Sequence, residues 1–187
     1  EKLHELGFKV MLWTCPFITP DTQEFRYLMN KEFLVRNQDG EVSIKKWWNG
    51  YSAVLDLTNP NAVKWYLDQN NFLIKEYGVD GFKFDAGDAN FYSEDDLTYG
   101  EIDANGQSKL WAELGVNYEY NEFRACVQCA GLPLVQRLAD KNHSWETNGV
   151  GSLIPNQLIQ GLLGYAYTCP DMIGGGEYLN FLENSEN

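Results

Sequence analysis

The sequence predicts an α/β fold, namely part of a (β/α)8 barrel whose parallel strands alternate with helices. Three observations support this prediction. Short apolar runs alternate with segments of helical period, as in βαβ units. Several of these runs end in polar residues, which is typical of the strands of barrel enzymes. No GxGxxG or GxxxxGK[ST] motif follows a strand, which disfavours the alternative, an open doubly wound nucleotide-binding sheet.

The first part of the chain contains one strand and one long helix. Residues 8–13 are a compact apolar run bounded by Pro16, which predicts a buried strand. Asn59 is the expected N-cap of a helix over 60–77, which begins with proline and ends at Gly78. Between these elements we expect helical stretches within 21–36, a turn at 37–40 and a short strand over 41–44.

The second part continues the alternation. We expect a strand over 79–85, a loop over 86–107, a helix over 108–129, a strand over 133–138, a helix over 152–162 and a strand over 164–168. A loop as long as 86–107 inside a compact domain is usually functional. The strands identified amount to half a barrel, whereas a complete one needs about 250 residues. Residues 1–187 are therefore expected to be a partial barrel domain whose flanking strands are missing from this chain.

Composition limits the classes of partner. The chain has 14 Lys+Arg against 27 Asp+Glu, a net charge of −13, and 44% hydrophobic residues, which suffice for one core. The acidity argues against nucleic-acid binding, which needs a basic surface. No apolar run reaches the roughly 18 residues of a membrane span. The cellular location and the oligomeric state are not determined by these features.

Cys126 and Cys129 have the spacing of a redox motif or half of a zinc site. A zinc site would need two more ligands, and no second CxxC is present. We therefore expect buried structural thiols and no metal. The remaining candidate ligands are Cys15, Cys169, His4 and His143.

Two aspartates follow predicted strands. Asp85 ends an apolar strand, and Lys83 projects from the same face, where its charge would help keep Asp85 ionised. Asp140 follows a similar strand. The alternatives are a structural Lys–Asp pair or a helix cap for Asp85 and an N-cap for Asp140. Two carboxyl groups on neighbouring barrel strands, with tryptophans near strand ends, are typical of glycoside hydrolysis.

Five motifs in order make the prediction specific. They are Gly7–Ile18 with its Trp-x-x-Pro ending, Trp48-x-Gly50 followed by Asp56-x-Thr-Asn-Pro60, Gly78–Asp85, the pair Arg124 and Asp140, and Asp171-Met-Ile-Gly-Gly175. Over nearly its whole length the chain resembles glycoside hydrolase family 31, the retaining α-glycosidases built on a (β/α)8 barrel. The resemblance implies that the chain covers about strands 3 to 7 of a catalytic barrel domain.

The resemblance also implies catalytic roles. Asp85 would be the nucleophile that forms a covalent glycosyl-enzyme, and Asp140 would be the acid/base. Retention of configuration implies carboxyl groups about 5–5.5 Å apart. Arg124 and Lys83 would hold Asp85 charged and bind sugar hydroxyl groups. No cofactor or metal is implied.

Three further residues are implied to contact the substrate. Trp13 would form a wall of the sugar subsite, and Trp48 would lie near the aglycone subsite. Asp171 would bind the substrate or brace the end of its strand. The implied partner is an oligosaccharide or another glycoside, and the rest of the barrel would come from flanking sequence.

The motifs around Asp140 and Asp171 depart from those of many α-glucosidases. The stretches Asp140-Lys-x-x-Ser-Trp145 and Pro170-Asp-Met-Ile-Gly-Gly175 are closer to the branch with bacterial α-galactosidases and the myogenesis-regulating glycosidase of animals. This favours an α-galactoside as the substrate. The alternatives are an α-glucosidase, an α-xylosidase or a non-catalytic sugar-binding relative.

Overall fold

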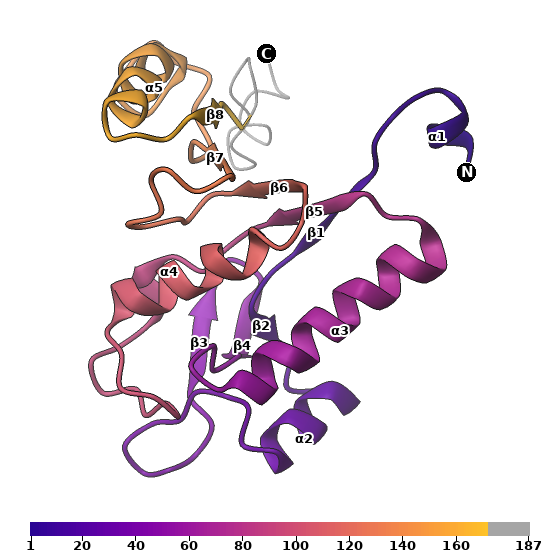
Figure 1. Ribbon diagram of the computed structural model, residues 1–187. Helices are drawn as coiled ribbons and strands as arrows, with labels where there is room; N and C mark the ends of the chain where they lie inside the picture. Colours follow the sequence, from indigo (N-terminus) through magenta and orange to yellow (C-terminus); the bar gives the residue numbers. More distant parts are fainter. Residues whose placement is uncertain (172–187) are drawn as a thin grey trace, which may run out of the picture.

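The structure is a computed structural model that describes residues 1–171. It contains a parallel sheet flanked by helices and a smaller antiparallel sheet (Figure 1). The helices are α1 (Lys2–Glu5), α2 (Gln23–Asn30), α3 (Pro60–Tyr77), α4 (Ala104–Gly115) and α5 (Leu153–Leu162), with 3-10 turns η1 (Ala89–Phe91) and η2 (Val150–Ser152). The strands are β1 (Met11–Thr14), β2 (Phe17–Ile18), β3 (Ile44–Trp47), β4 (Gly50–Val54), β5 (Gly81–Phe84), β6 (Tyr120–Phe123), β7 (Val135–Arg137) and β8 (Tyr167–Cys169).

The larger sheet has the order β1-β5-β6-β7-β8, and every neighbouring pair is parallel. Helix α3 precedes β5, α4 connects β5 to β6, and α5 connects β7 to β8. The connection from β6 to β7, residues 124–134, contains no helix. Successive parallel strands lying side by side and joined by helices confirm the predicted α/β architecture.

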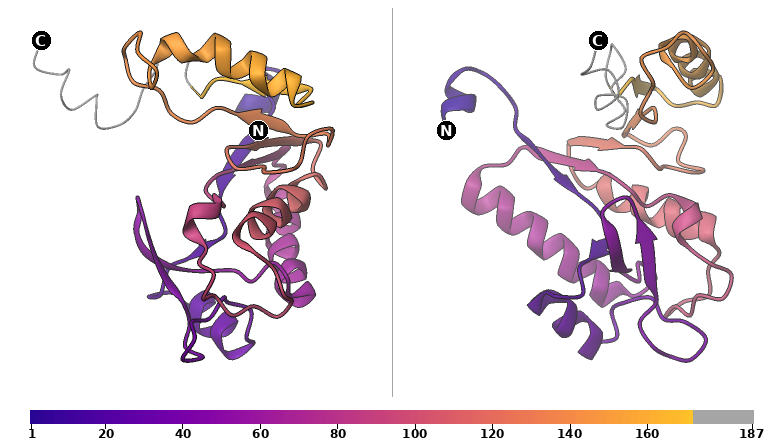
Figure 2. Two further views of the ribbon diagram at one scale, coloured as in Figure 1. Left: turned by 90° about the vertical axis from the view of Figure 1, so that its left-hand side faces the viewer. Right: turned by 180° about the vertical axis from the view of Figure 1, so that it is seen from behind.

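The smaller sheet is inserted between β1 and α3. Its order is β2-β4-β3, and both pairs are antiparallel. The β3–β4 hairpin turns at Trp48 and Asn49, and Gly50 adopts a φ of 96°, which favours glycine. The views in Figure 2 place this sheet at the opposite end of the molecule from α5.

Helix α3 has the bounds that the sequence predicts. The side chain of Asn59 accepts a hydrogen bond from the backbone N–H of Asn61 at 3.0 Å, and Pro60 occupies the first turn. Gly78 ends the helix in the left-handed conformation, with φ 67°. All three are local signals, which is why the sequence alone locates this helix.

One face of the parallel sheet packs on the helices. The rings of Phe84 and Phe123 stack with their centroids 4.7 Å apart, and Trp111 of α4 meets Phe84 edge-on at 5.4 Å. All three residues are fully buried. Because side chains alternate along a strand, Lys83 and Glu122 project from the opposite face of β5 and β6. That face carries the candidate site.

The helix predicted over 108–129 is wrong beyond Gly115. Helix α4 covers Ala104–Gly115, and β6 follows at Tyr120–Phe123. A Cβ atom on Gly115 would lie 1.9 Å from the ring of Phe123, so the turn between them is tightly packed. The loose helical period of the apolar residues continues through β6, so the pattern did not reveal this strand. Within β6, the buried side chain of Asn121 forms hydrogen bonds with backbone atoms of Tyr118, Pro133 and Val135.

The other predicted elements are present with shifted ends. The strand expected over 41–44 is β3 (Ile44–Trp47), and its partner β4 was not predicted. The loop expected over 86–107 contains η1 and ends where α4 begins. The helical stretch within 21–36 is α2, and the strands over 8–13, 79–85, 133–138 and 164–168 are the shorter β1, β5, β7 and β8. No helix within residues 1–171 is long and apolar enough to cross a membrane.

Candidate active site

Charged side chains gather at the carboxyl ends of the parallel strands, where barrel enzymes place their catalytic groups. Each strand from β5 to β8 contributes at least one of them. Asp85 follows β5, Arg124 follows β6, Arg137 is the last residue of β7 and precedes Asp140 by three positions, and Asp171 lies two residues after β8. The structure therefore brings together five positions that span 87 residues of sequence.

Asp85 is largely buried, with 13% of its side chain exposed. Its Oδ2 accepts a hydrogen bond from the indole Nε1 of Trp13 at 2.8 Å. Its Oδ1 accepts one from the backbone N–H of Ala86 at 2.9 Å and one from Nη2 of Arg137 at 3.1 Å, and Nη1 of Arg124 lies 3.5 Å away. Burial opposes ionisation, but these bonds and the two cations lower the pKa of Asp85 below its usual value. Asp85 is therefore a carboxylate at neutral pH.

The turn after Asp85 has an uncommon backbone. Ala86 and Gly87 adopt φ values of 56° and 77° in succession. A Cβ atom on Gly87 would lie 2.2 Å from the ring of Trp111, so glycine is required there. A left-handed alanine costs about 1–3 kcal/mol, and such strain concentrates at functional sites. The turn directs the Ala86 N–H onto the Asp85 carboxylate.

Arg137 is the centre of the charged cluster, and only 3% of its side chain is exposed. Its guanidinium pairs with Asp85 at 3.1 Å, Asp140 at 3.0 Å, Asp171 at 3.0 Å and Glu122 at 3.3 Å. Burial disfavours its charge, but the surrounding carboxylates raise its pKa above the ordinary arginine value. A single buried cation thus holds four carboxylates in place.

Lys83 does not pair with Asp85, contrary to the prediction. Its Nζ lies 3.5 Å from Glu122 on the neighbouring strand β6 and 3.3 Å from Asp171, which follows β8. The cations beside Asp85 are Arg124, as predicted, and Arg137, which was not. The sequence placed Lys83 on the correct face, but parallel pairing sets it opposite Glu122 in the register.

Aromatic rings line one side of the cluster. The ring of Trp13 lies parallel to that of Trp47 at 6.5 Å, and half of the Trp13 side chain is exposed. Trp48, at the tip of the inserted hairpin, lies 4.4 Å from the guanidinium carbon of Arg124, a cation–π contact. The inserted sheet thereby carries Trp48 to the end of β6.

Asp140 is more exposed than Asp85, with 48% of its side chain accessible. It lines an open cavity of about 600 Å³ together with Asp88, Arg124 and Arg137. Nη1 of Arg137 binds Asp140 while Nη2 of the same group binds Asp85. A second cavity, of about 480 Å³, surrounds the start of α3 and is lined by none of the predicted site residues.

Sequence reasoning missed three charged residues of the cluster, namely Arg137, Glu122 and Asp88. Arg137 ends an apolar strand, the same signal that identified Asp85. Glu122 was hidden because its strand was assigned to a helix. Asp88 lies in the expected functional loop, and only the turn at Ala86 brings it next to Arg124.

Cys126 and Cys129 are free thiols, and both are buried, as predicted. Burial raises the pKa of Cys126 to about 12 and also raises that of Cys129. Within residues 1–171 no group of three or more His, Cys, Asp or Glu side chains is arranged to hold a metal ion.

Comparison with known proteins identifies the family of the chain. Residues 1–172 match the family model described as the glycosyl hydrolases family 31 TIM-barrel domain. The chain belongs to glycoside hydrolase family 31. The fold class is therefore that of the family 31 barrel, of which this chain contains a part.

The sequence of the chain aligns with those of named relatives. The chain is 35% identical to the myogenesis-regulating glycosidase of Mus musculus over 178 residues. This alignment covers 93% of this chain and 25% of the relative. The chain is also 35% identical over 88 residues to the alpha-xylosidase XylQ of Lactiplantibacillus pentosus, 47% of this chain and 11% of the relative. The chain thus spans about a quarter or less of the length of these relatives.

A solved family 31 structure has the same fold. The sulfoquinovosidase from E. rectale superposes with a TM-score of 0.78 at 24% sequence identity, over 93% of this chain and 28% of that chain. Of the family motif Asp171–Gly175, only Asp171 lies within the described residues.

Proposed function

We propose that the chain is part of the catalytic barrel of a retaining α-glycosidase in which Asp85 is the nucleophile and Asp140 the acid/base. One observation carries the proposal: both carboxylates bind the two terminal nitrogens of one buried guanidinium, that of Arg137. This arrangement supports a pair of carboxyl groups close enough to act on one glycosidic bond. The remaining strands would come from polypeptide outside residues 1–187.

The two carboxyl groups have environments that suit different tasks. Asp85 is buried and held ionised, as a nucleophile requires. Oδ1 of Asp85 has two hydrogen-bond donors and a nearby arginine, whereas Oδ2 has the indole of Trp13 alone, so we assign the attack to Oδ2. Asp140 is half exposed and lines the open cavity, from which it could reach a leaving oxygen and water.

The proposed reaction has two steps. Oδ2 of Asp85 attacks the anomeric carbon, the bond from that carbon to the leaving oxygen breaks, and Asp140 transfers its proton to that oxygen. Water then attacks the anomeric carbon of the glycosyl-enzyme, Asp140 takes a proton from the water, and the Asp85 ester bond breaks. One water molecule is consumed, and the configuration is retained.

The neighbouring residues would bind and orient the sugar. Trp13 offers an exposed indole face beside Asp85, and Arg124 has N–H groups directed toward the same carboxylate. Trp48 would lie on the aglycone side, next to Arg124. Lys83 and Asp171 form an ion pair on the same face of the sheet, from which they could contact sugar hydroxyl groups.

We propose an α-galactoside as the substrate. The support is the motif around Asp171 and the 35% identity to a relative of the branch that this motif resembles. A second candidate is an α-xyloside, because a relative that matches 47% of the chain is named an alpha-xylosidase.

The test is release of nitrophenol from α-galactoside, α-glucoside and α-xyloside by the full-length protein, with Asp85→Asn as the control. Hydrolysis of the galactoside alone, lost in the variant, is the expected result. Preference for the xyloside or glucoside would keep the mechanism and overturn the substrate. Full activity of Asp85→Asn would overturn the mechanism, and sugar binding without any hydrolysis would favour a non-catalytic relative.

A further inference from the structure

The guanidinium of Arg124 is held from three directions. Its Nη1 lies 3.5 Å from Oδ1 of Asp85, and its face lies against the ring of Trp48. Its Nη2 donates a hydrogen bond to Oδ2 of Asp88. Asp88 thus contacts Arg124 directly, although it belongs to neither the predicted catalytic pair nor the predicted sugar-binding residues.

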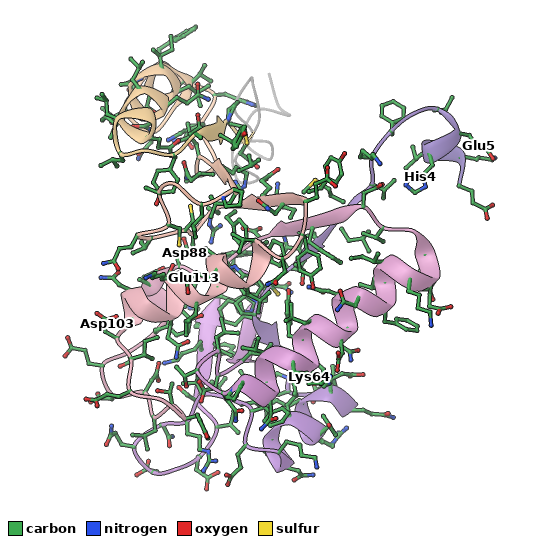
Figure 3. All side chains as sticks on the ribbon, in the orientation of Figure 1. His4, Glu5, Lys64, Asp88, Asp103 and Glu113 are labelled. Atoms are coloured by element: carbon green, nitrogen blue, oxygen red, sulfur yellow. The ribbon has the colours of Figure 1, made fainter. Side chains whose placement is uncertain are left out.

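The backbone turn after Asp85 places Asp88 close to the candidate nucleophile. The two left-handed residues Ala86 and Gly87 reverse the chain after Asp85, so the carboxylate three positions later returns to the same edge of the sheet. Trp111 of α4 packs against Gly87 and fixes this turn. Figure 3 shows Asp88 beside α4, where the chain enters η1.

Within residues 1–171, the side chain of Asp88 caps no helix, although the residue occupies the N-cap position of η1. Within residues 1–171, its carboxylate forms an ion pair with Arg124. About a third of the side chain is exposed, into the cavity that Asp140 and Arg124 also line.

We propose that Asp88 is a positioning residue, which holds Arg124 at the distance from Asp85 that the reaction needs. The proposal rests on the glycosidase function proposed above. Opposite charges at contact distance attract strongly in a partly buried site, so an Arg124 released by Asp88 would close onto Asp85. A close two-point pair would engage both carboxylate oxygens of the nucleophile and turn the remaining N–H groups away from the sugar.

The test compares four variants of the full-length protein on whichever nitrophenyl α-glycoside the wild type hydrolyses. Asp88→Asn removes the charge, Asp88→Glu keeps it, Arg124→Lys weakens the partner, and the double variant Asp88→Asn/Arg124→Lys closes a thermodynamic cycle. Asp68→Asn is the matched control, because Asp68 forms an ion pair with Lys64 on the surface of α3, away from the site (Figure 3).

Asp88→Asn is expected to lower kcat/KM by roughly 10- to 100-fold, since displacing a positioning group by about 1 Å can cost about 100-fold. Both a lower kcat and a higher KM are expected, because the nucleophile and the sugar contact are affected together. Asp88→Glu should restore most of the activity. The double variant should lose little more than Arg124→Lys alone, and Asp68→Asn should match the wild type.

Two results would overturn the inference and leave the proposed function intact. One is an Asp88→Asn variant as active as the wild type. The other is a double variant whose loss equals the product of the single losses, since Asp88 would then act independently of Arg124. A wild-type protein that hydrolyses none of the glycosides would instead overturn the proposed function.

Discussion

The two ends of strand β5 each carry an aspartate, and the comparison between them separates a structural cluster from a candidate active site. Asp80 precedes the strand. It accepts hydrogen bonds from the backbone N–H of Val10 at 2.8 Å and from His4 and Lys9 at 2.7 and 3.0 Å. These bonds lower its pKa below the usual value. His4 and Lys9 are exposed (Figure 3 labels His4), and no other carboxylate within residues 1–171 pairs with them.

Asp85 follows the same strand and also accepts three hydrogen bonds, from Trp13, Ala86 and Arg137. Its pKa is lowered as well. The difference lies in the partners: Arg137 also binds other carboxylates, Arg124 also binds Asp88, and Trp13 has an exposed face. Because the pKa is lowered at both ends, the feature that distinguishes the candidate active site is that the cations beside Asp85 also bind other carboxylates.

The largest expected effect is that of Asp85→Asn. Loss of the nucleophile should lower kcat by about 10⁴-fold or more, because the step that forms the glycosyl-enzyme is removed. The amide still accepts a hydrogen bond from Trp13, so the full-length variant should remain folded. Hydrolysis rates and a thermal melt of the same sample measure both effects. Retained activity would contradict the distinction between the two ends.

Arg137→Met is expected to be the most destabilising change. It leaves four carboxylates without their buried cation, which should cost about 3 kcal/mol in the free energy of unfolding. The contribution of Asp85 is present above its unfolded pKa of about 3.9 and is lost as the pH falls through its lower folded pKa.

Denaturant unfolding at several pH values measures this difference. The gap in stability between wild type and Arg137→Met should therefore be largest near neutral pH and should narrow below about pH 4, as Asp85 becomes protonated. A gap that stays constant with pH would show that lost packing, and not lost charge, explains the effect.

Trp48→Ala should have an intermediate effect. It removes the cation–π contact with Arg124, which is worth about 1 kcal/mol, or about fivefold in kcat/KM. Trp48→Phe keeps an aromatic face and should recover part of the loss. Steady-state kinetics of the two variants test whether the inserted sheet contributes to the site. Equal activity of Trp48→Ala and wild type would exclude that contribution.

Asp80→Asn should have the smallest effect on catalysis. Its partners lie near the start of β5, at the opposite end of the strand from Asp85, so kcat/KM should remain that of the wild type. The stabilisation from Asp80 is present above its unfolded pKa of about 3.9 and disappears as the pH falls toward its lower folded pKa. The melting temperatures of wild type and variant should therefore converge in acid. A large loss of activity would show that both ends of β5 support the site.

Local signals explain what the sequence could predict. Asn59, Pro60 and Gly78 define α3, and an aspartate after an apolar run identified Asp85 and Asp140. Strand β6 was missed because its identity depends on distant segments: Glu122 lies opposite Lys83 in the register, and Asn121 bonds the chain before β7. No local pattern contains that information.

The same reasoning explains the partial success at the site. Asp171 was predicted as a polar residue at a strand end, whereas Arg124 lay within the helix expected over 108–129 and was predicted from the family resemblance alone. The pairing of Lys83 with Glu122 and Asp171, and the central place of Arg137, depend on how strands align side by side. The family resemblance predicted roles for individual residues, whereas the contacts among these residues became visible only in the structure.

The side chains that lie opposite one another on the polar face of the sheet also constrain how the strands can pair. Trp13 pairs with Lys83, and Lys83 with Glu122, in the parallel register. Sliding β6 by one residue would turn Glu122 toward the apolar helices and place Asn121 or Phe123 among the cations. The charged residues beneath the candidate site therefore also help to set the strand register, because a misaligned sheet would bury Glu122 among apolar side chains.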